Sequence, residues 1–591
     1  MSNQNRPNIL FLMADQWHHL DFGYRGHPVV KTPNLDKLAS QSIDYTHTYA
    51  QNAFCLPSRA CMLTGQYVRT HRQYGFTGLF GEGTPCLPEL LQQNGYHTFH
   101  VGKFHCNPLA GRMGFDEFVP TLPEDMWQAT DPDVNYLKWS RDHGIGYPND
   151  QVHGDYRTMA PPEPLELGGK KLDMYGTSCI PLEKSIERYT ADQAVAFIER
   201  DHEKPFYLSV SFDRPHGPWT PSPEDVDLYD PAAIPLPDPL GEADLARLPE
   251  HLAHYISTYS VGLQKIGEEG MRKVLSLYYA LITRVDAEIG RLLDTLERTG
   301  QADNTIVVFC TDHGDMAGHL GLFDKYSNRL YHDDIIRTPL LLKVPCEAQT
   351  PRQMHGNVEL IDLFPTLCER AGIPTETLPL DGKDLLSLPN ENATPWSGTA
   401  FSESYGMKTV IKDGWKLIYY VNHDEGELYD LGNDAREYQN LYTDPACRTK
   451  RIELLQELVR FFTPTPSEKR QAYIRTLFDD SDMVARGAMG RLFKWDKGIV
   501  EGDGFWQSIK DGHKLTVIPF EGVCRLEKLD ADNPADGLVW NYAPVEDDER
   551  LEAMLGRLVD YLAGKIRPIS LMTGGEEGRE NMMFCRGFGL C

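Results

Sequence analysis

The sequence lacks the features that mark several classes of protein. Its twelve cysteines are scattered, without a CxxC pair or a dense cluster, so we expect reduced thiols in a cytoplasmic protein rather than a disulfide framework. No stretch approaches the roughly 20 apolar residues of a membrane helix. The apolar run 9–14 near the N-terminus is too short for the core of a signal peptide. These absences predict a chain that neither spans nor docks on a membrane.

Positive charge is also scarce. The 591 residues include 58 Lys and Arg against 86 Asp and Glu, a formal net charge of −28. Nucleic acids and anionic membranes are bound through clustered Lys and Arg, so both are excluded as expected partners. A small anionic substrate stays open, because a single site can be locally positive. The hydrophobic content of 41% is ordinary for a globular protein, and the length exceeds one compact domain.

What is present is an alternation of buried strands and amphipathic helices. Short apolar runs predict buried parallel strands, and segments with leucines at helical spacing lie between them. The predicted strands are 8–14, 205–212, 304–311 and 338–344, and the predicted helices include 32–42, 269–300 and 358–372. This order predicts an α/β fold with a large, mainly parallel sheet flanked by helices.

Three parts are predicted along the chain. We expect a catalytic domain in residues 1–375, with surface excursions at 120–175 and 217–250, and a smaller α+β subdomain in 376–465. Residues 466–591 form a C-terminal extension to which we assign oligomer contacts. "IKDGHKL" at 509–515 repeats "IKDGWKL" at 411–417, and a helix follows each copy, which favours a duplicated hairpin-helix unit over chance likeness of two Asp-Gly hairpins.

Two predicted strands end in metal-ligating residues. Asp15 and Gln16 follow the first strand, and Asp312 and His313 follow the third. Ligands in open α/β sheets bind beyond the carboxyl ends of the strands, so these side chains are expected to meet. Two carboxylates, an amide and an imidazole suit one divalent cation, Mn²⁺ or Ca²⁺. The alternative is that the aspartates cap helices.

The stretch "NAFCLPSRACMLTG" places Cys55 in a polar setting that suits neither a packed thiol nor a Cys-His nucleophile. Its Cys-x-Pro-Ser-Arg and closing Thr-Gly resemble the signature of the formylglycine-dependent sulfatases, in the alkaline-phosphatase-like superfamily. Five further segments are similar to segments of that family, and the resemblance covers about residues 6–465. They are "RPNILFLMADQ", "GYHTFHVGKFH", "FDRPHGPW", "TDHGDMAGHLGLFDK" and, in the C-terminal subdomain, "GELYDLGND".

The resemblance implies a mechanism and a role for each matching residue. Cys55 would be oxidised by a formylglycine-generating enzyme, and the hydrated aldehyde, activated by one divalent metal, would attack the sulfur of a sulfate monoester and later expel sulfate. The metal ligands would be Asp15, Gln16, Asp312, His313 and the converted Cys55. Arg59 would hold the formylglycine oxygen, Lys103 and Lys325 the sulfate oxygens, His105 the diol as base, and His216 the leaving oxygen.

Two residues depart from the common pattern of the family and indicate particular branches of it. Gln16 stands where the family commonly has a second aspartate, and His313 where many lysosomal members have asparagine. Asp-Gln with Asp-His is similar to the cytoplasmic choline sulfatase and phosphonate monoester hydrolase branches. The phosphonate branch tends to lack the Gly-Lys-x-His segment, so Lys103 and His105 favour sulfate monoesters. A phosphonate monoester or phosphodiester hydrolase is the alternative, and a binding protein with unconverted Cys55 a third hypothesis.

The remaining residues of these segments are interpreted as structural or left undecided. Cys61 is expected to be a packing thiol and His319 a structural histidine. Trp17, His18, Trp219 and Tyr326 flank the motifs, where they either line a specificity pocket or pack. The cytoplasmic branches also imply a homo-oligomer of two or four chains, with the tail 580–591 docked.

Overall fold

The computed structural model describes most of the chain. The described residues are 6–75, 84–106, 114–122, 125, 129–145, 163–167, 170–258, 262–325, 330–345, 352–388, 396–462 and, beyond these, the strands and the helix named below between 494 and 565. They form two compact units, one within Met1–Ser404 and one within Tyr405–Arg567. The three-part division at residues 375 and 465 remains a prediction.

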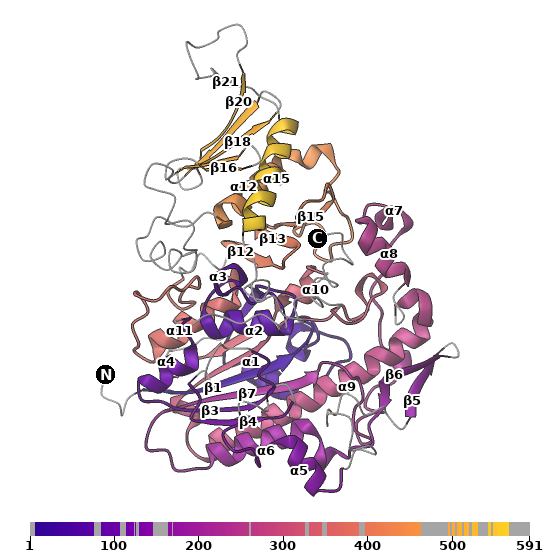
Figure 1. Cartoon of the computed structure of the whole chain (residues 1–591). Helices are drawn as coiled ribbons and strands as arrows, with labels where there is room; N and C mark the ends of the chain where they lie inside the picture. The colour runs from indigo at the N-terminus through magenta and orange to yellow at the C-terminus, as the bar shows by residue number, and fades with distance from the viewer. Residues whose placement is uncertain are drawn as a thin grey trace. The chain divides into compact units, whose positions relative to one another are not determined.

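A large sheet forms the centre of the first unit (Figure 1). Among the described residues it has nine strands in the order β11-β2-β10-β8-β1-β7-β3-β4, with β9 paired to β2. The strands are β1 (Asn8–Asp15), β2 (Ile43–Tyr49), β3 (His97–Gly102), β4 (Glu117–Pro120), β7 (Phe206–Pro215), β8 (Thr305–Thr311), β9 (Arg337–Thr338), β10 (Leu340–Lys343) and β11 (Arg352–Glu359). A hairpin of β5 (Glu163–Leu167) and β6 (Lys170–Thr177) and the strand β12 (Thr399–Glu403) complete the unit's described strands.

The sheet is mixed and mainly parallel, as predicted. β1 pairs in parallel with both β7 and β8, and β3 pairs in parallel with β7. The prediction of a parallel strand at 338–344 is wrong: β10 runs antiparallel to β8 and to β2. Two reversals leave β2 pointing the same way as β8. The carboxyl ends of β1, β2, β3, β7 and β8 therefore share one edge of the sheet.

Helices cover both faces of this sheet (Figure 1). The described helices of this unit are α1 (Pro33–Ala39), α2 (Cys55–Thr64), α3 (Val68–His71), α4 (Leu87–Gln93), α5 (Tyr136–Asp142), α6 (Ile186–Ile198), α7 (Glu242–Leu245), α8 (Glu250–Thr258), α9 (Leu263–Arg298), α10 (Asp333–Ile336) and α11 (Leu363–Arg370). In β1, Leu10 and Leu12 face the core formed with α1, α6 and α9, whereas Ile9 and Phe11 face the core formed with α2, α4 and α11. Burial on both faces explains the unbroken apolar runs of the central strands.

Two helix boundaries differ from the sequence prediction. α9 begins at Leu263, six residues before the predicted start, and contains a non-helical Gly267 with φ of 69°. The predicted helix 358–372 begins only at Leu363, because Val358 and Glu359 still belong to β11. A capping box between Glu359 and Asp362 opens the turn η9 (Leu360–Asp362) and marks the change from strand to helix.

The second unit contains two antiparallel sheets and two helices among its described residues. In the first segment, β13 (Met407–Lys412), β14 (Trp415–Tyr420) and β15 (Gly426–Asp430) pair in order, and α12 (Arg448–Phe462) follows. The turn residues Asp413 and Gly414 have φ of 49° and 76°, as a two-residue hairpin turn requires.

The described residues between 494 and 565 repeat the order of antiparallel strands followed by a helix. Their strands pair in sequence and α15 (Asp548–Lys565) packs against α12. The strands are β16 (Lys494–Asp496), β17 (Ile499–Gly502), β18 (Phe505–Lys510), β19 (His513–Ile518), β20 (Val523–Leu529) and β21 (Tyr542–Pro544). β18 and β19 pair from Lys510 and His513, at the place where β13 and β14 pair from Lys412 and Trp415. The common origin of the two segments remains a prediction.

Some predictions fall on other parts of the chain. Tyr326 and the tail 580–591 lie outside the described residues. Among the helices that are described, none combines the length and the apolar character needed to cross a bilayer.

Candidate active site

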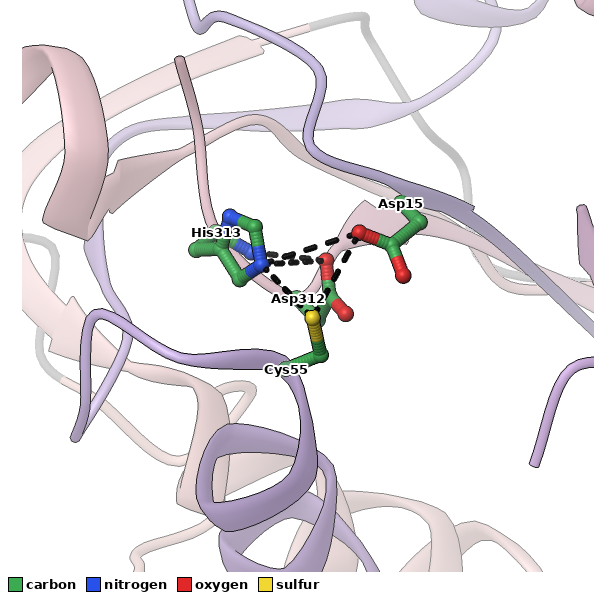
Figure 2. Close-up of side chains that lie close together, drawn as sticks. All are labelled: Asp15, Cys55, Asp312 and His313. Carbon is green, nitrogen blue, oxygen red and sulfur yellow. Dashed lines mark hydrogen bonds and ion pairs between the residues drawn. The ribbon is translucent and has the colours of Figure 1, made fainter. Parts of the chain in front are cut away.

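Five strand ends bring the predicted residues to one edge of the sheet. Asp15 ends β1, Asp312 and His313 follow β8, Lys103 follows β3, and His216 follows β7. Cys55 is the first residue of α2, which begins shortly after β2. The side chains of Asp15, Cys55, Asp312 and His313 offer ligand atoms that all lie within 4.8 Å of one another (Figure 2).

The thiol of Cys55 contacts two members of this group. Its Sγ is 3.2 Å from Nε2 of His313 and 3.8 Å from Oδ1 of Asp15. Burial and the Asp15 carboxylate raise the pKa of this thiol, but Lys325, Lys103 and His313 outweigh them and the net pKa is lowered. The position at the start of a helix adds to the same effect, because unpaired N–H groups point toward it.

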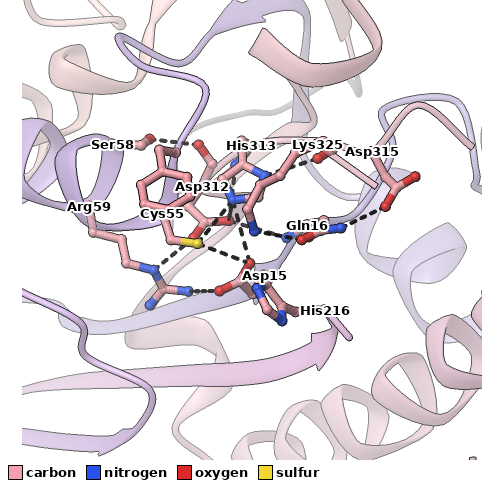
Figure 3. Close-up of polar contacts among 12 residues, drawn as sticks. Asp15, Gln16, Cys55, Ser58, Arg59, His216, Asp312, His313, Asp315 and Lys325 are labelled. Carbon is pink, nitrogen blue, oxygen red and sulfur yellow. Dashed lines mark hydrogen bonds and ion pairs between the residues drawn. The ribbon is translucent and has the colours of Figure 1, made fainter. Parts of the chain in front are cut away.

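The motif residues after Cys55 fasten α2 to the strand ends. Ser58 Oγ donates to the backbone carbonyl of Asp312 at 2.6 Å. Arg59 Nε lies 2.7 Å from Asp312 Oδ2, and its Nη2 lies 3.1 Å from Asp15 Oδ2. One guanidinium thus bridges the carboxylates of two strands, as Figure 3 shows. Gly65 ends the helix with φ of 64°, and a Cβ there would lie 3.0 Å from Phe364 and from Leu380.

Lys103 is fully buried and paired with two carboxylates. Its Nζ lies 2.5 Å from Asp15 Oδ2 and 3.3 Å from Asp213 Oδ1. Gly102 turns the chain into the site with φ of 110°, and a Cβ at this glycine would lie 2.0 Å from the backbone oxygen of Ser211. The glycine is therefore required by the close approach of β3 and β7.

Electrostatic pairing fixes the charge of Asp15. Burial raises the pKa of this carboxyl, but Lys103, Lys325 and Arg59 together hold it well below its usual value. Asp15 is therefore an anion at neutral pH, although it is completely buried. The structure brings together the negative groups that a cation needs and the positive groups that an anionic substrate needs.

His313 is oriented as a metal ligand would be. Its Nδ1 lies 2.9 Å from the carbonyl oxygen of Gly314, which can only accept a hydrogen bond. Nδ1 therefore carries a proton, and Nε2 faces Asp15, Asp312 and Cys55. Burial and Lys325 lower the pKa of this ring, but Asp312 and Cys55 outweigh them and the net pKa is raised, so a cation at Nε2 would compete with a proton. A buried set of two carboxylates and an imidazole nitrogen fits one divalent cation.

Gln16 and Lys325 lie at the side of this group (Figure 3). Lys325 Nζ donates to Gln16 Oε1 at 2.6 Å, and its pKa is raised: burial opposes the rise, and the charges of Cys55 and Asp15 outweigh burial. Gln16 has φ of 64°, and its backbone N–H donates to Asp312 Oδ1 at 3.2 Å. Its amide oxygen contacts Lys325, and its role as a ligand remains a prediction.

His216 and His105 border the site. His216 is half-buried, and its Nδ1 lies 2.7 Å from the carbonyl oxygen of Gly217. Burial, Lys325 and Lys103 lower its pKa well below the usual value, so the ring is neutral. His105 is buried with φ of 53°, and its backbone N–H donates to Asp125 Oδ1 at 2.9 Å. The role of its ring remains a prediction.

Sequence reasoning missed three polar residues of the site. Asp125 holds the backbone N–H groups of Phe104 and His105, Asp213 pairs with Lys103, and Ser58 joins α2 to β8. Asp213 lies at the carboxyl end of β7, and the strand-end rule that located Asp15 applies to it equally. Asp125 follows a Pro-rich stretch, where the sequence carries no comparable signal.

The residues that the sequence left undecided or interpreted as structural are mostly buried against neighbouring side chains. Cys61 is buried with its Sγ 3.1 Å from His71 Nε2, and His319 pairs with Asp334 at 2.5 Å. Trp17 stacks on Phe22 at 4.8 Å. His18 lies between Asp21 and Asp334, and burial, which lowers its pKa, is outweighed by these carboxylates, which raise it to about 9. Trp219 is 4% exposed and stacks on Tyr175.

Known proteins resemble this chain over most of its length. An N-acetylglucosamine-6-O-sulfatase of Bacteroides thetaiotaomicron is 27% identical, covering 84% of this chain and 90% of its own. A choline-sulfatase of Rhizobium meliloti is 28% identical, covering 74% and 83%. The solved phosphonate monoester hydrolase of Agrobacterium radiobacter superposes with a TM-score of 0.64 at 22% identity, covering 84% of this chain and 100% of its own, which is a likeness of fold.

Two family models match. The C-terminal model of N-sulphoglucosamine sulphohydrolase matches residues 318–463. The sulfatase model matches residues 7–373, which contain every predicted site residue from Asp15 to Lys325. With more than half of its length matched, the chain belongs to the sulfatase family.

Proposed function

We propose that this protein is a sulfuric ester hydrolase that cleaves aryl or small alkyl sulfate monoesters through a formylglycine made from Cys55. The observation that carries this is the position of Cys55. Its Sγ lies 3.2 Å from Nε2 of His313, among carboxylates that fit a divalent cation and beside cations that fit a sulfate group. A hydroxyl on residue 55 would therefore lie between the carboxylates that fit a divalent cation and the cations that fit a sulfate group.

The residues divide into those that hold a metal and those that hold the substrate. Asp15, Asp312, His313, Gln16 and the converted residue 55 are the proposed ligands of one Mn²⁺ or Ca²⁺, which would lower the pKa of the attacking hydroxyl. Arg59 and Lys103 pair with the ligand carboxylates, so their charge is already fixed before a substrate arrives. No reorganisation is then needed as charge develops on the sulfate oxygens.

Lys325 and His216 are assigned to the departing side of the ester. Lys325 is charged at neutral pH and can donate a proton or a hydrogen bond to the leaving oxygen. His216 Nδ1 donates to the carbonyl oxygen of Gly217, so Nε2 is the atom left for the leaving oxygen, and it donates there only when the ring carries a second proton. His105 is the proposed base for release of sulfate. A cytoplasmic location and an oligomer of two or four chains remain predictions.

The test begins with residue 55 itself. Intact mass of the peptide that contains residue 55, from protein made in its native host, is expected to be that of the aldehyde. A Cys55→Ala variant is expected to lose activity on an aryl sulfate by at least about 10³-fold, because the nucleophile is gone. A thiol mass together with activity on the sulfate would remove the proposed nucleophile.

A phosphonate monoester hydrolase is the second candidate. The likeness of fold to such enzymes and the presence of Gln16 and His313 favour it. Lys103 and His105, which the resemblance links to sulfate monoesters, favour the first. The ratio of kcat/KM on an aryl sulfate to that on an aryl phenylphosphonate separates the two, and a large phosphonate preference would reverse the assignment.

A further inference from the structure

The side-chain amide of Gln16 is held at both of its ends. Nε2 donates to Asp315 Oδ2 at 2.7 Å and to Asp324 Oδ1 at 2.8 Å. Oε1 accepts from Lys325 Nζ at 2.6 Å. Figure 3 shows the amide lying between Lys325 and Asp315. A carboxylate only accepts and an ammonium only donates, so these partners permit one orientation of the amide.

The backbone of Gln16 is fixed as well. Its N–H donates to Asp312 and its carbonyl oxygen accepts from Tyr278 Oη at 2.8 Å. A half-turn of the amide would place its oxygen against two carboxylates and its NH₂ group against the ammonium of Lys325. All three contacts would then be repulsive. The amide oxygen therefore faces the site because Asp315 and Asp324 exclude the alternative.

Asp315 has no spare oxygen for other work. Its Oδ1 accepts from the backbone N–H groups of Ala317 and Asp324, at 2.8 and 3.0 Å. Only Oδ2 is directed at Gln16. An asparagine at this position would keep its single oxygen on the two backbone donors, so its NH₂ group would face residue 16. The local geometry thus makes residue 315 a switch between an acceptor and a donor.

We propose that Asp315 and Asp324 are positioning residues that direct the Gln16 amide oxygen at the metal position and so allow an amide to stand where a carboxylate is common. This inference rests on the proposed function. The oxygen has two lone pairs, of which Lys325 uses one, and the other is left for the cation. A glutamate at position 16 would instead place its carboxylate against those of Asp315 and Asp324. A carboxylate is usually a stronger metal ligand than an amide, but the Gln16→Glu variant is therefore expected to bind the metal less tightly.

The experiment is a double-mutant cycle read by metal binding. Wild type, Gln16→Glu, Asp315→Asn and the double variant are purified as full chains, stripped of metal and titrated with Mn²⁺ in a calorimeter. Asp315→Asn is expected to lower Mn²⁺ affinity about 10- to 100-fold beside the native Gln16. In the Gln16→Glu background the same change is expected to raise the affinity, because the NH₂ group of the introduced asparagine donates to the introduced carboxylate.

The sign of the Asp315→Asn effect decides the matter. A loss in both backgrounds means that Asp315 only braces its own loop, and this overturns the inference while the proposed function stands. A wild type that takes up neither Mn²⁺ nor, in a parallel titration, Ca²⁺ overturns both. If a single variant fails to fold, recovery of folding in the double variant supports the inference, and its absence overturns it. Asp303→Asn is the matched control. Asp303 is exposed and precedes the first residue of β8, at the end of the strand opposite the site, so this variant is expected to keep its full affinity for Mn²⁺.

Discussion

Buried carboxyl groups lie in two places near helix α2, and their charge states differ. At its N-terminus, Asp15 faces Lys103, Arg59 and Lys325, and its pKa is well below the usual value despite burial. Against the same helix packs η9, which carries Asp362, with Glu359 directly before it. There burial, and for Glu359 also the neighbouring Asp362 charge, raise the pKa of Glu359 to about 8 and that of Asp362 to about 6.

The partners explain the difference. Glu359 accepts from Tyr67 Oη at 2.7 Å and from the Phe401 N–H at 2.9 Å, and Asp362 accepts from the Lys383 N–H at 2.8 Å. These donors are neutral, so they do not offset the cost of a buried charge. Burial and the nearby Asp362 charge therefore keep Glu359 protonated at neutral pH, because no cation among the described residues is paired with it. Cations placed around a buried carboxyl group make a carboxylate that can bind a metal.

The largest effect is expected when one of the cations around the Asp15 carboxylate is removed. Lys103→Met leaves the buried Asp15 carboxylate with fewer counter-charges, which is expected to cost about 3–5 kcal/mol of unfolding free energy. The rate on an aryl sulfate is expected to fall about 10²- to 10³-fold, because a donor to the sulfate is lost. Calorimetric unfolding and steady-state kinetics measure the two effects.

The same variant also changes the response to pH. The lowered pKa of Asp15 contributes stability that is present above its unfolded pKa and lost as the pH falls. In Lys103→Met this acid-sensitive part is expected to shrink. Unchanged stability and rate in the variant would mean that Lys103 does not set the charge of Asp15.

An effect of opposite sign on the pH dependence is expected at Glu359. Glu359 has a folded pKa of about 8, above its unfolded value, so wild-type stability falls as the pH rises from about 5 to 8 and levels off beyond. The slope from one such group is about 1.4 kcal/mol per pH unit. Glu359→Gln mimics the protonated form and is expected to remove this slope. Unfolding temperatures of both proteins across this range measure it.

The control for that variant is its activity. Glu359 has no place in the proposed chemistry, so the rate on an aryl sulfate is expected to stay near the wild-type value at pH 7. A Glu359→Gln protein with the same pH slope as wild type would show that this carboxyl group is already ionised when buried.

The smallest expected effect is at the surface. Lys37 and Glu297 form an ion pair at 2.9 Å, but their side chains are 49% and 51% exposed. Lys37→Met makes the same chemical change as Lys103→Met where water screens the charge. It is expected to change the unfolding free energy by no more than about 0.5 kcal/mol. A loss as large as that of Lys103→Met would show that burial is not what separates the two lysines.

Sequence patterns located the strands better than their directions. β1 and β8 were predicted from unbroken apolar runs, and the residues after them were expected to meet because parallel strands share an edge. The same kind of run at 338–344 gave no sign that β10 is antiparallel, since periodicity carries no direction. An apolar residue such as Val358 fits the pattern of a strand as well as that of a helix, so the predicted start of α11 was too early.

The site was predicted where a motif or a strand end carried it. Cys55, Arg59 and Lys103 come from motifs, and Asp15 and Asp312 from strand ends. Asp315 and Asp324 lie in a predicted motif segment, but their contacts with Gln16 depend on a loop that returns on itself, with φ of 77° at Asp324. Asp125 reaches the backbone of His105 from a segment without regular pattern. Such contacts depend on tertiary geometry that local sequence does not encode.

Gly65 has a consequence for the detection of inactive relatives in genomes. Its left-handed backbone and the nearby Phe364 and Leu380 disfavour a side chain here, whatever happens to Cys55. A descendant that had lost the modification and its chemistry would still retain this glycine to fold. The closing Thr-Gly is therefore a marker of ancestry, and a survey for pseudoenzymes has to score residue 55 and the cations around it instead.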